Sequence, residues 1–504
     1  MKIKTLEIAS ILLLLVGVTV NFLNVTPVVC SQGTRKVPTE YSTIQEAIDA
    51  SNPGDIIHVS KGTYTEHLSI TKNLLTLIGE NLNTTIIDGN QTGTVIKVLA
   101  NNVTITGFTV RESGDSGEGI YVYYSSNNTI VRNVIYDCYV GIRVSYSRNT
   151  TIIENTIANN SDSGIILQVN TRNTFINSNN ITNNGYVGIN VFAYADNNTI
   201  SENIVMNNGY SGIQLYLPRW NRVYENILMF NERGVRFVGD RTAYNTISEN
   251  VIAQNKFGID FWDSSSLRNV IYHNDIINNV YQLYLESPLG NFAGNIWNNT
   301  ANEGNYWSDY EGEDLNSDGI GDTSTPHLGV DYYPLDNPKS PIPLLLNGQL
   351  YRVTLHSSSV VSEFHFIQAS KEINFKVIGP NGTQGHCNIT IPKDLLNPLA
   401  SQSWEVLLDG ANLNVTIAEN ATSTSLYFIY THSIHDVRIT VRASDNLIFY
   451  VIGTIVSLVL VVGTAVALIK RKQKNRRLAY AKLKSQSNSN SDGFSDVFSG
   501  VGQS

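Results

Sequence analysis

Short apolar segments alternate with polar residues along most of the chain, and the pattern returns at a fixed interval. A glycine followed by Ile or Val recurs every 22 to 24 residues, at Gly119, Gly141, Gly164, Gly188, Gly212, Gly234 and Gly258. Asparagine recurs with the same period at Asn133, Asn155, Asn179, Asn203, Asn226, Asn250 and Asn274. A fixed period of this size is typical of a solenoid, in which each repeat packs on its neighbours.

One repeat, residues 197–215, contains three short segments of alternating polarity separated by Asn and Gly. This alternation indicates strands, and no stretch between them has the length or periodicity of a crossover helix. We therefore predict an all-β fold with a right-handed parallel β-helix over residues 37–300. Successive coils would lie ~4.8 Å apart. The core-facing residues of this coil would be Ile200, Ile204, Ile213 and Leu215.

The periodic asparagines are interpreted as structural. Asn tolerates left-handed backbone angles, and its amide can bond the amide of the next coil, so a column of Asn would line one turn.

Both ends of a solenoid need a cover, since open strand edges promote aggregation. Ser42–Ala50 predicts a short capping helix in which Ser42 is the N-cap and Ile44, Ala47 and Ile48 share a face. Residues 301–335, which follow Trp297 and contain Tyr306, Trp307 and Tyr310, would form the C-terminal cap.

The chain ends carry targeting signals. Residues 1–31 read as a signal peptide with cleavage near Ser31, and an uncleaved N-terminal anchor is the alternative. The charge-free apolar segment 447–469 predicts one transmembrane helix. Residues 470–504 hold eight Lys or Arg against two Asp, so this tail would be cytoplasmic and the body extracellular, at the plasma membrane.

Between the β-helix and the predicted span, the period disappears. Residues 350–443 contain alternating segments such as Tyr351–Leu355, Ile373–Ile378 and Val437–Val441, which predict a small β-sandwich. The proline-rich residues before it predict a linker over 336–349.

Composition narrows the partners and the environment. The formal charge is −9 although the tail is basic, so the exported part is acidic, which argues against nucleic acid as a partner. Three cysteines exclude a disulfide framework, although one Cys138–Cys387 bridge stays open. Asn-x-Ser/Thr sequons suit a glycoprotein, and Asn-rich turns beside Thr-rich strands explain them equally well. They include Asn83, Asn102, Asn149, Asn180, Asn298, Asn381 and Asn414.

The segments Tyr41–Gly89 and Gly304–Asp322 resemble the NosD-type branch of the pectate-lyase-like β-helix proteins, which include carbohydrate-binding proteins and sugar hydrolases and occur as archaeal surface proteins. The resemblance covers about residues 37–335. It implies the β-helix fold and, through NosD, an association with copper delivery. Copper sites need clustered His, Met or Cys, and here His58, His67 and His273 are scattered along the β-helix.

The segment Asp314–Asp322 contains oxygen-bearing residues at alternating positions and glycines at the turn, like the first half of a calcium loop. We predict a structural Ca²⁺ site, completed by Glu311, Glu313 or Asp331. The alternative is a polar turn that binds nothing. The predicted ligands are Asp314, Asn316, Asp318, the Ile320 carbonyl and Asp322.

The candidate catalytic residues are Asp240, Asp260 and Asp263, with Arg236, Arg241 and His273 near them in the repeat. Arg236 and Asp260 each follow a coil glycine by two residues, so they would stack as neighbours. A solvated ion-pair ladder and a polysaccharide-cleaving site both fit this cluster.

Aromatic residues supply the candidate ligand-binding positions Tyr121, Tyr123, Trp220 and Trp262. Exposed rings stack on sugar faces, although alternate strand positions would bury some of them. The first functional hypothesis is a surface protein that binds glycans or other surface proteins. A polysaccharide lyase or glycosidase is the alternative, and a copper accessory protein is the minor one.

Overall fold

The computed structural model describes residues 33–287, 292, 294–398, 402–443 and 445–489 of the 504-residue chain. The predicted signal peptide and the last 15 residues lie outside this range. The chain divides into two compact units. The β-helix unit runs to Trp307 and includes Pro326–Tyr333, and the second unit contains Ser308–Thr325 and the residues from Pro334 onward.

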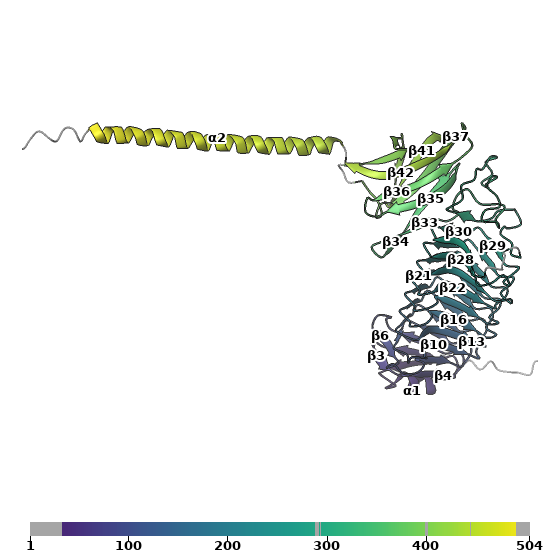
Figure 1. Cartoon of the computed structure of the whole chain (residues 1–504). Coiled ribbons are helices and arrows are strands. Elements are labelled where there is room, and N and C mark those ends of the chain that lie inside the picture. Colours follow the sequence, from purple (N-terminus) through teal and green to yellow (C-terminus); the bar gives the residue numbers. More distant parts are fainter. Residues whose placement is uncertain (1–32, 288–291, 293, 399–401, 444, 490–504) are drawn as a thin grey trace, which may run out of the picture. The chain divides into compact units, whose positions relative to one another are not determined.

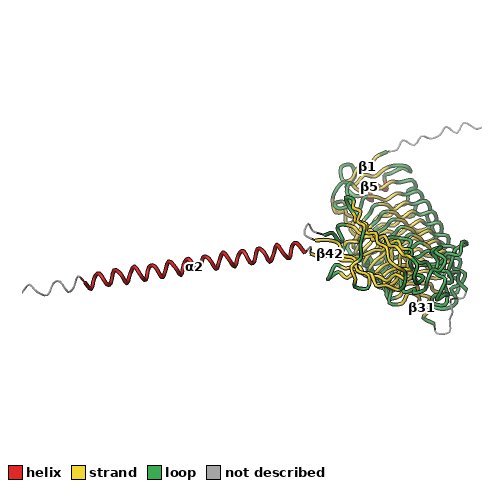
Figure 2. Tube along the Cα trace, turned by 90° about the horizontal axis from the view of Figure 1, so that it is seen from above, coloured by secondary structure: helices red, strands yellow, loops and turns green. Residues whose placement is uncertain are grey.

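The β-helix unit is a stack of coils, each of which contributes one strand to each of three parallel sheets (Figures 1 and 2). Sheet A has eleven strands: β1 (Thr34–Val37), β2 (Ile56–Val59), β5 (Thr76–Gly79), β8 (Thr104–Thr106), β11 (Thr129–Val131), β14 (Thr151–Ile153), β17 (Phe175–Asn177), β20 (Thr199–Ser201), β23 (Arg222–Tyr224), β26 (Thr246–Ser248) and β29 (Val270–Tyr272).

Sheet B also has eleven strands: β3 (Gly62–Thr65), β6 (Thr85–Asp88), β9 (Thr109–Arg111), β12 (Val134–Tyr136), β15 (Thr156–Ala158), β18 (Asn180–Thr182), β21 (Ile204–Met206), β24 (Ile227–Met229), β27 (Val251–Ala253), β30 (Asp275–Ile277) and β32 (Tyr306–Trp307).

Sheet C has ten strands: β4 (Leu68–Ile70), β7 (Ile96–Val98), β10 (Glu118–Tyr123), β13 (Val140–Ser145), β16 (Ile165–Gln168), β19 (Ile189–Phe192), β22 (Ser211–Tyr216), β25 (Arg233–Val238), β28 (Phe257–Phe261) and β31 (Tyr281–Leu285). Every strand pairs in parallel with the strand one coil away, as in β10 and β13 or β25 and β28. The prediction of a parallel β-helix is confirmed.

The core lies inside the three sheets. Ile200, Ile213 and Leu215 have no exposed surface, as predicted. The prediction for Ile204 is wrong, because in β21 the middle residue Val205 is buried while Ile204 is half-exposed. A three-residue strand turns only its central side chain inward when its ends belong to the corners of the coil.

The periodic glycines are explained by close packing between coils. A Cβ atom on Gly141 would lie 2.6 Å from the Gly164 carbonyl oxygen and 2.6 Å from the Ile157 side chain. Any larger residue at this position would push neighbouring coils apart, which accounts for the glycine period.

The buried asparagines form three ladders, one at each corner of the coil. The predicted ladder runs from Asn133 to Asn305, and at each step an Asn side chain donates to the Oδ1 of the next Asn, as from Asn203 to Asn226 at 2.9 Å. A second ladder runs from Asn160 to Asn279 and a third from Asn198 to Asn295.

We expected the ladder asparagine to adopt the left-handed backbone conformation at these corners. Instead, the residue before it does. Arg132, Glu154, Glu202 and Glu225 all have φ between 53° and 56°. The ladder Asn keeps a negative φ, and its amide supplies the bonds that hold the strained corner in place.

The N-terminal cap is the helix α1 (Ile44–Asp49), which buries Ile44, Ala47 and Ile48 and packs against β1, β2 and β4. Its N-cap is Thr43 rather than Ser42. Thr43 accepts from the backbone of Glu46, and Glu46 accepts from the backbone of Thr43, which completes a capping box.

The second unit contains two five-stranded antiparallel sheets, one of order β33–β34–β37–β41–β40 and one of order β35–β36–β42–β38–β39. Their strands are β33 (Ile342–Leu346), β34 (Gln349–Ser357), β35 (Val360–Ile367), β36 (Glu372–Ile378), β37 (Gln384–Pro392), β38 (Gln402–Leu408), β39 (Ala411–Asn412), β40 (Thr416–Glu419), β41 (Ser423–Thr431) and β42 (Ile434–Ala443). The predicted small β domain is confirmed.

Two boundaries differ from those expected. Residues 336–349 are not a linker, because β33 lies within them and pairs with β34. The predicted cap, 301–335, is divided between the two units.

Cys138 and Cys387 are both free and buried, so they do not form the disulfide bridge that the sequence left open. Of the seven sequons named above, Asn298 is half-buried and the others are exposed.

The chain continues into the helix α2 (Asp445–Ser489), which includes the predicted transmembrane segment 447–469. Side chains of residues 445–455 lie outside the description. Among the helices as far as they are described, none is long and apolar enough to cross a membrane.

Candidate functional site

The outward side of sheet C carries rows of aromatic and polar side chains that continue from coil to coil. In β10, Ile120 and Val122 are buried in the core, and the alternate residues Tyr121 and Tyr123 face outward and are half-buried. The strand register extends the position of Tyr121 into a row. This row contains Lys97, Tyr121, Arg143, Ile166, Asn190, Gln214, Arg236, Asp260 and Tyr284.

Aromatic rings cover the outward face around its early coils and its middle. The ring centroids of Tyr121 and Tyr123 lie 5.2 Å apart, and Tyr124 stacks on Tyr146 with ring centroids 4.5 Å apart. Lys97 lies 5.9 Å from the Tyr121 ring centroid, within cation–π distance. Tyr124 is 62% exposed, so this cluster offers a flat ring to solvent.

Further along the sheet, stacked rings follow both of its long edges, the one where its strands begin and the one where they end. Phe192 and Tyr216, on neighbouring strands, stack at 4.8 Å. On the opposite edge Tyr186 and Tyr210, which precede β19 and β22, also stack at 4.8 Å. Polar side chains of the central row, such as Gln214, lie buried between these edges. We refer to this outward side of sheet C, from Lys97 to Glu286, as the sheet C face.

Asp260 is the centre of a buried ion-pair cluster at one end of the sheet C face. Its Oδ2 lies 2.8 Å from Arg233 Nε and 3.3 Å from Arg236 Nε. The same two arginines reach Glu286, at 2.6 Å and 3.1 Å. Two cations and two carboxylates thus alternate across β25, β28 and the end of β31. The predicted stacking of Arg236 and Asp260 is present in the register of these strands.

Aromatic rings enclose this cluster. The Tyr210 ring centroid lies 4.2 Å from the Arg233 guanidinium carbon and 4.9 Å from that of Arg236, and Trp262 lies 4.9 Å from Arg236. Asp260 is completely buried, and the two arginines are 6% and 3% exposed. Trp262, which is 50% exposed, therefore forms part of the outer surface of the cluster, together with the partly exposed Glu286.

Burial sets the electrostatics of the cluster. It raises the pKa of Asp260 to about 6, against the lowering effects of Arg236 and Arg233. For Arg233, burial lowers the pKa, but the hydrogen bond to Glu286 and the charges of Asp260 and Glu232 raise it overall. Arg233 therefore stays charged, while Asp260 changes its protonation state in the mildly acidic range.

Asp260 Oδ1 is buried without a hydrogen-bond partner, whereas Arg236 Nε and Arg233 Nη1, which also make no hydrogen bond, lie 3.3 Å from Asp260 and 3.1 Å from Glu232 in ion pairs. A buried unsatisfied group typically costs about 1–3 kcal/mol. Asp260 Oδ1 therefore marks a place where a bound water would complete the network.

The other predicted catalytic residues do not join Asp260. Asp240 is exposed, and its carboxylate has no bond among the described residues. Asp263 accepts hydrogen bonds from the backbone and hydroxyl of Ser265 in its own turn. Arg241 pairs with Asp196 at 2.7 Å, and His273 follows a strand of sheet A and pairs with Glu303 at 2.8 Å. The candidate residues are thus distributed over separate contacts.

Among the predicted binding residues, Tyr121, Tyr123 and Trp262 belong to the sheet C face, whereas Trp220 does not. Trp220 lies in the turn between β22 and β23, is 49% exposed and stacks on Tyr244 at 5.9 Å. It therefore lies at the corner between sheets C and A.

Arg233, Glu286 and Tyr210 are functional candidates that the sequence reasoning missed. Arg233 directly precedes the coil glycine Gly234, and Tyr210 precedes Gly212 by two residues. The repeat places Arg233 and Tyr210 at adjacent positions of neighbouring coils, but it carried no sign of which side chains would meet across the coils.

The predicted calcium loop closes on itself. Asp314 accepts from the backbone of Ser317 at 2.7 Å and Gly319 at 2.9 Å, and Asp318 accepts from the Ile320 backbone at 3.0 Å. Asp322 similarly accepts from the Leu315 backbone. Within the described residues, no group of three or more His, Cys, Asp or Glu is gathered for a metal ion.

Asp331 belongs to the β-helix unit, where it is buried and bonded to Asn305, Trp307 and Tyr333. Both of its carboxylate oxygens thus already accept hydrogen bonds. The calcium site, with Glu311, Glu313 or Asp331 to complete its shell, stays a prediction.

Two family models match parts of the β-helix unit. Residues 93–244 match a right-handed β-helix region, and residues 178–312 match the periplasmic copper-binding protein NosD. Together with the three parallel sheets, these matches confirm the predicted right-handed parallel β-helix and a likeness to NosD over residues 178–312. The search of curated proteins gave no match.

Several solved structures resemble the chain at low identity. The A-module of a mannuronan C-5 epimerase from Azotobacter vinelandii is 15% identical and covers 50% of this chain and 93% of that one, with a TM-score of 0.37. A pectate lyase is 15% identical over 50% of this chain and 72% of that one, with a TM-score of 0.40. The Dettilon tailspike protein is 12% identical over 81% and 95%, with a TM-score of 0.36.

Proposed function

We propose that this protein binds glycans through the sheet C face and does not cleave them. The observation that supports this most directly is the continuation of stacked rings along the edges of one sheet, from Tyr124 and Tyr146 to Phe192 and Tyr216. Flat apolar rings next to hydrogen-bonding side chains are the chemistry that recognises sugar rings. A repeated arrangement suits a repeating polymer.

The charge along the sheet C face favours a neutral glycan. Arg143 lies 2.7 Å from Glu118, and Arg233 and Arg236 are matched by Asp260 and Glu286. Since these charged side chains are already paired, a charged sugar that bound them would have to break an existing ion pair. A neutral sugar can instead share hydrogen bonds with the outer atoms of each pair.

The pairing of Asp260 argues against catalysis. General acid–base cleavage of a glycosidic bond uses two carboxyl groups on opposite sides of the bond. Asp260 and Glu286 share the same two arginines, and Asp240 and Asp263 contact neither of them. The raised pKa of Asp260 is the one observation that favours the lyase or glycosidase alternative.

The test uses a glycan array with the exported chain and three variants. Trp262→Ala and Tyr123→Ala should each lower binding at least tenfold, because each removes a ring from the sheet C face. Trp220→Ala is the matched control, since it removes an equally exposed indole outside that face. Unchanged binding by both face variants would contradict the proposal.

Assays for reducing ends and unsaturated products run in parallel separate the two functions. We expect no turnover of any glycan that binds. Turnover that disappears in Asp260→Ala, while the variant stays folded, would replace the binding function with a catalytic one.

The proposed location is a cell surface, with the C-terminal segment as a membrane anchor. Its support is the sequence alone: the charge-free segment 447–469 is followed at once by Lys470, Arg471 and Lys472. Fractionation of cells that express the full chain or a chain ending before Leu447 tests it. Recovery of both in the soluble fraction would exclude the anchor.

A further inference from the structure

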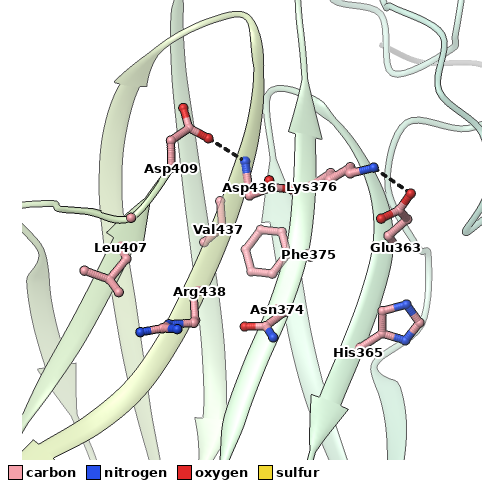
Figure 3. Close-up of a pocket in the computed structure, with 11 residues that line it drawn as sticks. Glu363, His365, Asn374, Phe375, Lys376, Leu407, Asp409, Asp436, Val437 and Arg438 are labelled. Carbon is pink, nitrogen blue, oxygen red and sulfur yellow. Dashed lines mark hydrogen bonds and ion pairs between the residues drawn. The ribbon is translucent and has the colours of Figure 1, made fainter.

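The second unit contains a polar pocket that is independent of the sheet C face. It has a volume of about 560 Å³ and is lined by residues of the sheet β35–β36–β42–β38–β39 (Figure 3). This volume is in the range of about 300–1,000 Å³ that is usual for small-molecule sites.

The strand register aligns the pocket residues in two rows. One row crosses four strands through His365, Asn374, Arg438 and Leu407. The neighbouring row contains Lys376 and Asp436, with Asp409 bonded to the backbone of Asp436 at 2.9 Å and Glu363 to Lys376 at 2.6 Å. Figure 3 shows the residues of these rows on adjacent strands.

The polar pocket residues do not belong to the core. On the same strands, the alternate residues Ile373, Phe375, Val437 and Ile439 are at most 2% exposed and fill the sandwich interior. Arg438 and Asp436 are exposed. Substitutions of these polar side chains therefore leave the packing of the unit intact.

Part of the pocket is already paired. Lys376 contacts Glu363 at 2.6 Å and Glu311 at 3.7 Å, and Asp409 contacts His435 at 2.7 Å. The hydrogen bond with His435 holds the pKa of Asp409 below its usual value. These pairs fix the rim of the pocket.

Three polar groups in the pocket have no partner among the described residues. The Arg438 guanidinium and the Asp436 carboxylate make no hydrogen bond or ion pair there, and Asn374 Oδ1 is buried and unsatisfied. One donor and two acceptors thus lie on the adjacent strands β36 and β42. Since an unsatisfied buried acceptor is costly, Asn374 Oδ1 indicates a ligand that donates hydrogen bonds.

The charges around the pocket restrict the ligand class. Three carboxylates, Glu363, Asp409 and Asp436, face two cations, Lys376 and Arg438. This excess of negative charge disfavours an anion, and the position of Arg438 between Asn374 and Leu407 disfavours a cation. A hydroxyl group both donates and accepts, so neighbouring hydroxyls match the mixed set of free groups.

We infer that this pocket binds one unit of a neutral saccharide. Hydroxyl groups donate to the Asp436 carboxylate and to Asn374 Oδ1, and Arg438 donates to a hydroxyl or ring oxygen. The site does not depend on the function proposed for the sheet C face, because the two lie in separate units.

Saturation-transfer NMR on the full chain tests this inference. The probes are glucose, galactose, mannose and N-acetylglucosamine, with glucuronate as an anion and glycine as a dipolar ligand. We expect transfer to at least one neutral sugar, and a loss of at least tenfold in its affinity in Arg438→Ala and in Asn374→Ala.

Matched controls separate this pocket from other surfaces. Lys393→Ala removes a cation of the same unit that pairs with Glu419 outside the pocket, and Asn388→Ala removes an exposed amide from the other sheet. Both should bind like the wild type, and so should Trp262→Ala. Loss of binding in Trp262→Ala alone would assign the sugar to the sheet C face.

Two further outcomes would overturn the inference. One is that no neutral sugar binds, or that Arg438→Ala and Asn374→Ala both bind it as tightly as the wild type does. The other is binding of glycine or glucuronate that depends on Arg438 when neutral sugars do not bind. An unchanged far-UV spectrum of each variant ensures that a loss of binding reflects the pocket.

Discussion

Asn305 and Asp331 end the first asparagine ladder: Asp331 Oδ2 accepts from the Asn305 backbone at 2.8 Å and from its side-chain amide at 3.3 Å. The same oxygen accepts from Trp307 Nε1 at 2.9 Å, and Oδ1 accepts from the Tyr333 backbone at 3.0 Å. A carboxylate has no donor, so it ends a chain of amides without leaving an unpaired N–H.

We expect Asp331→Ala to lower the free energy of unfolding of the last coils by about 3–5 kcal/mol, because it leaves several buried donors unpaired. Asp331→Asn should cost less, since its Oδ1 can still accept. Urea unfolding followed by the fluorescence of Trp297 and Trp307 measures the effect. Asp115→Ala, in an exposed turn, is the control. Equal stability of the Asp115 and Asp331 alanine variants would contradict this role.

A second prediction compares a buried and an exposed asparagine ladder. Asn226 is fully buried and donates to Asn250 Oδ1, the Ile200 carbonyl and the Tyr224 carbonyl, each at 2.9 Å. Asn149 donates to Asn127 at 2.9 Å on the exposed surface.

Asn226→Ala should therefore destabilise the protein by about 3 kcal/mol or more and Asn149→Ala by less than about 1 kcal/mol, since water replaces only the exposed bonds. Hydrogen exchange of the amides in β21, β24 and β27 localises the change. Similar losses for the two variants would mean that amide pairing, rather than burial, stabilises the corners.

The third prediction concerns pH. The pKa of Asp260 is raised to about 6 by burial, so the folded protein holds this proton over a range in which the unfolded chain has released it. Stability from this group is complete below about pH 4 and is lost as the pH rises through 6, with a slope of at most about 1.4 kcal/mol per pH unit.

Chemical unfolding between pH 4 and 7 checks this sign. Asp260→Asn should flatten the profile, because it removes the titrating group. Asp336 has its pKa raised to about 6 by burial as well, so Asp336→Asn should flatten the unfolding profile of the second unit only. An Asp260→Asn profile as steep as that of the wild type would assign the slope to other groups.

The fourth prediction tests the calcium loop. If the loop binds Ca²⁺, saturation at 100 times the dissociation constant should stabilise the protein by about 2.7 kcal/mol, and a chelator should reverse it. Asp318→Asn is the informative variant, because it keeps an acceptor for the Ile320 backbone while it removes a ligand charge. A melting temperature that ignores both calcium and chelator would leave the loop as a polar turn.

The β-helix was predictable because its determinants are local and repeated. Gly141 and its equivalents each mark the same close contact between neighbouring coils, and the Asn133 ladder marks the same corner in successive coils. The other two ladders have the same period, at Asn160 and Asn198 and onward, and were overlooked although the sequence contains them. The identity of the N-cap and the burial of Val205 depend on single-residue geometry, which a period cannot resolve.

The candidate site was less predictable, because it depends on contacts across several coils. The pairing of Arg236 with Asp260 follows from the register, but Glu286 reaches Arg233 from 53 residues away and from a strand end without a coil glycine. The pocket around Arg438 likewise needs four strands from distant parts of the sequence. Long-range side-chain meetings of this kind leave no periodic signal.

The ladders also give each coil a direction. In the bonds between ladder asparagines, each donates to the Asn of the C-terminal coil and accepts from the Asn of the N-terminal one, as Asn203 accepts from Asn179 and donates to Asn226. The donor side of one coil is therefore complementary to the acceptor side of the next. A coil such as residues 203–225 is a repeat unit that can be exchanged as a whole. Duplication or deletion of one whole coil would change the number of coils under the sheet C face, while both end caps keep their contacts. The length of the β-helix can therefore vary in evolution or design without a new fold.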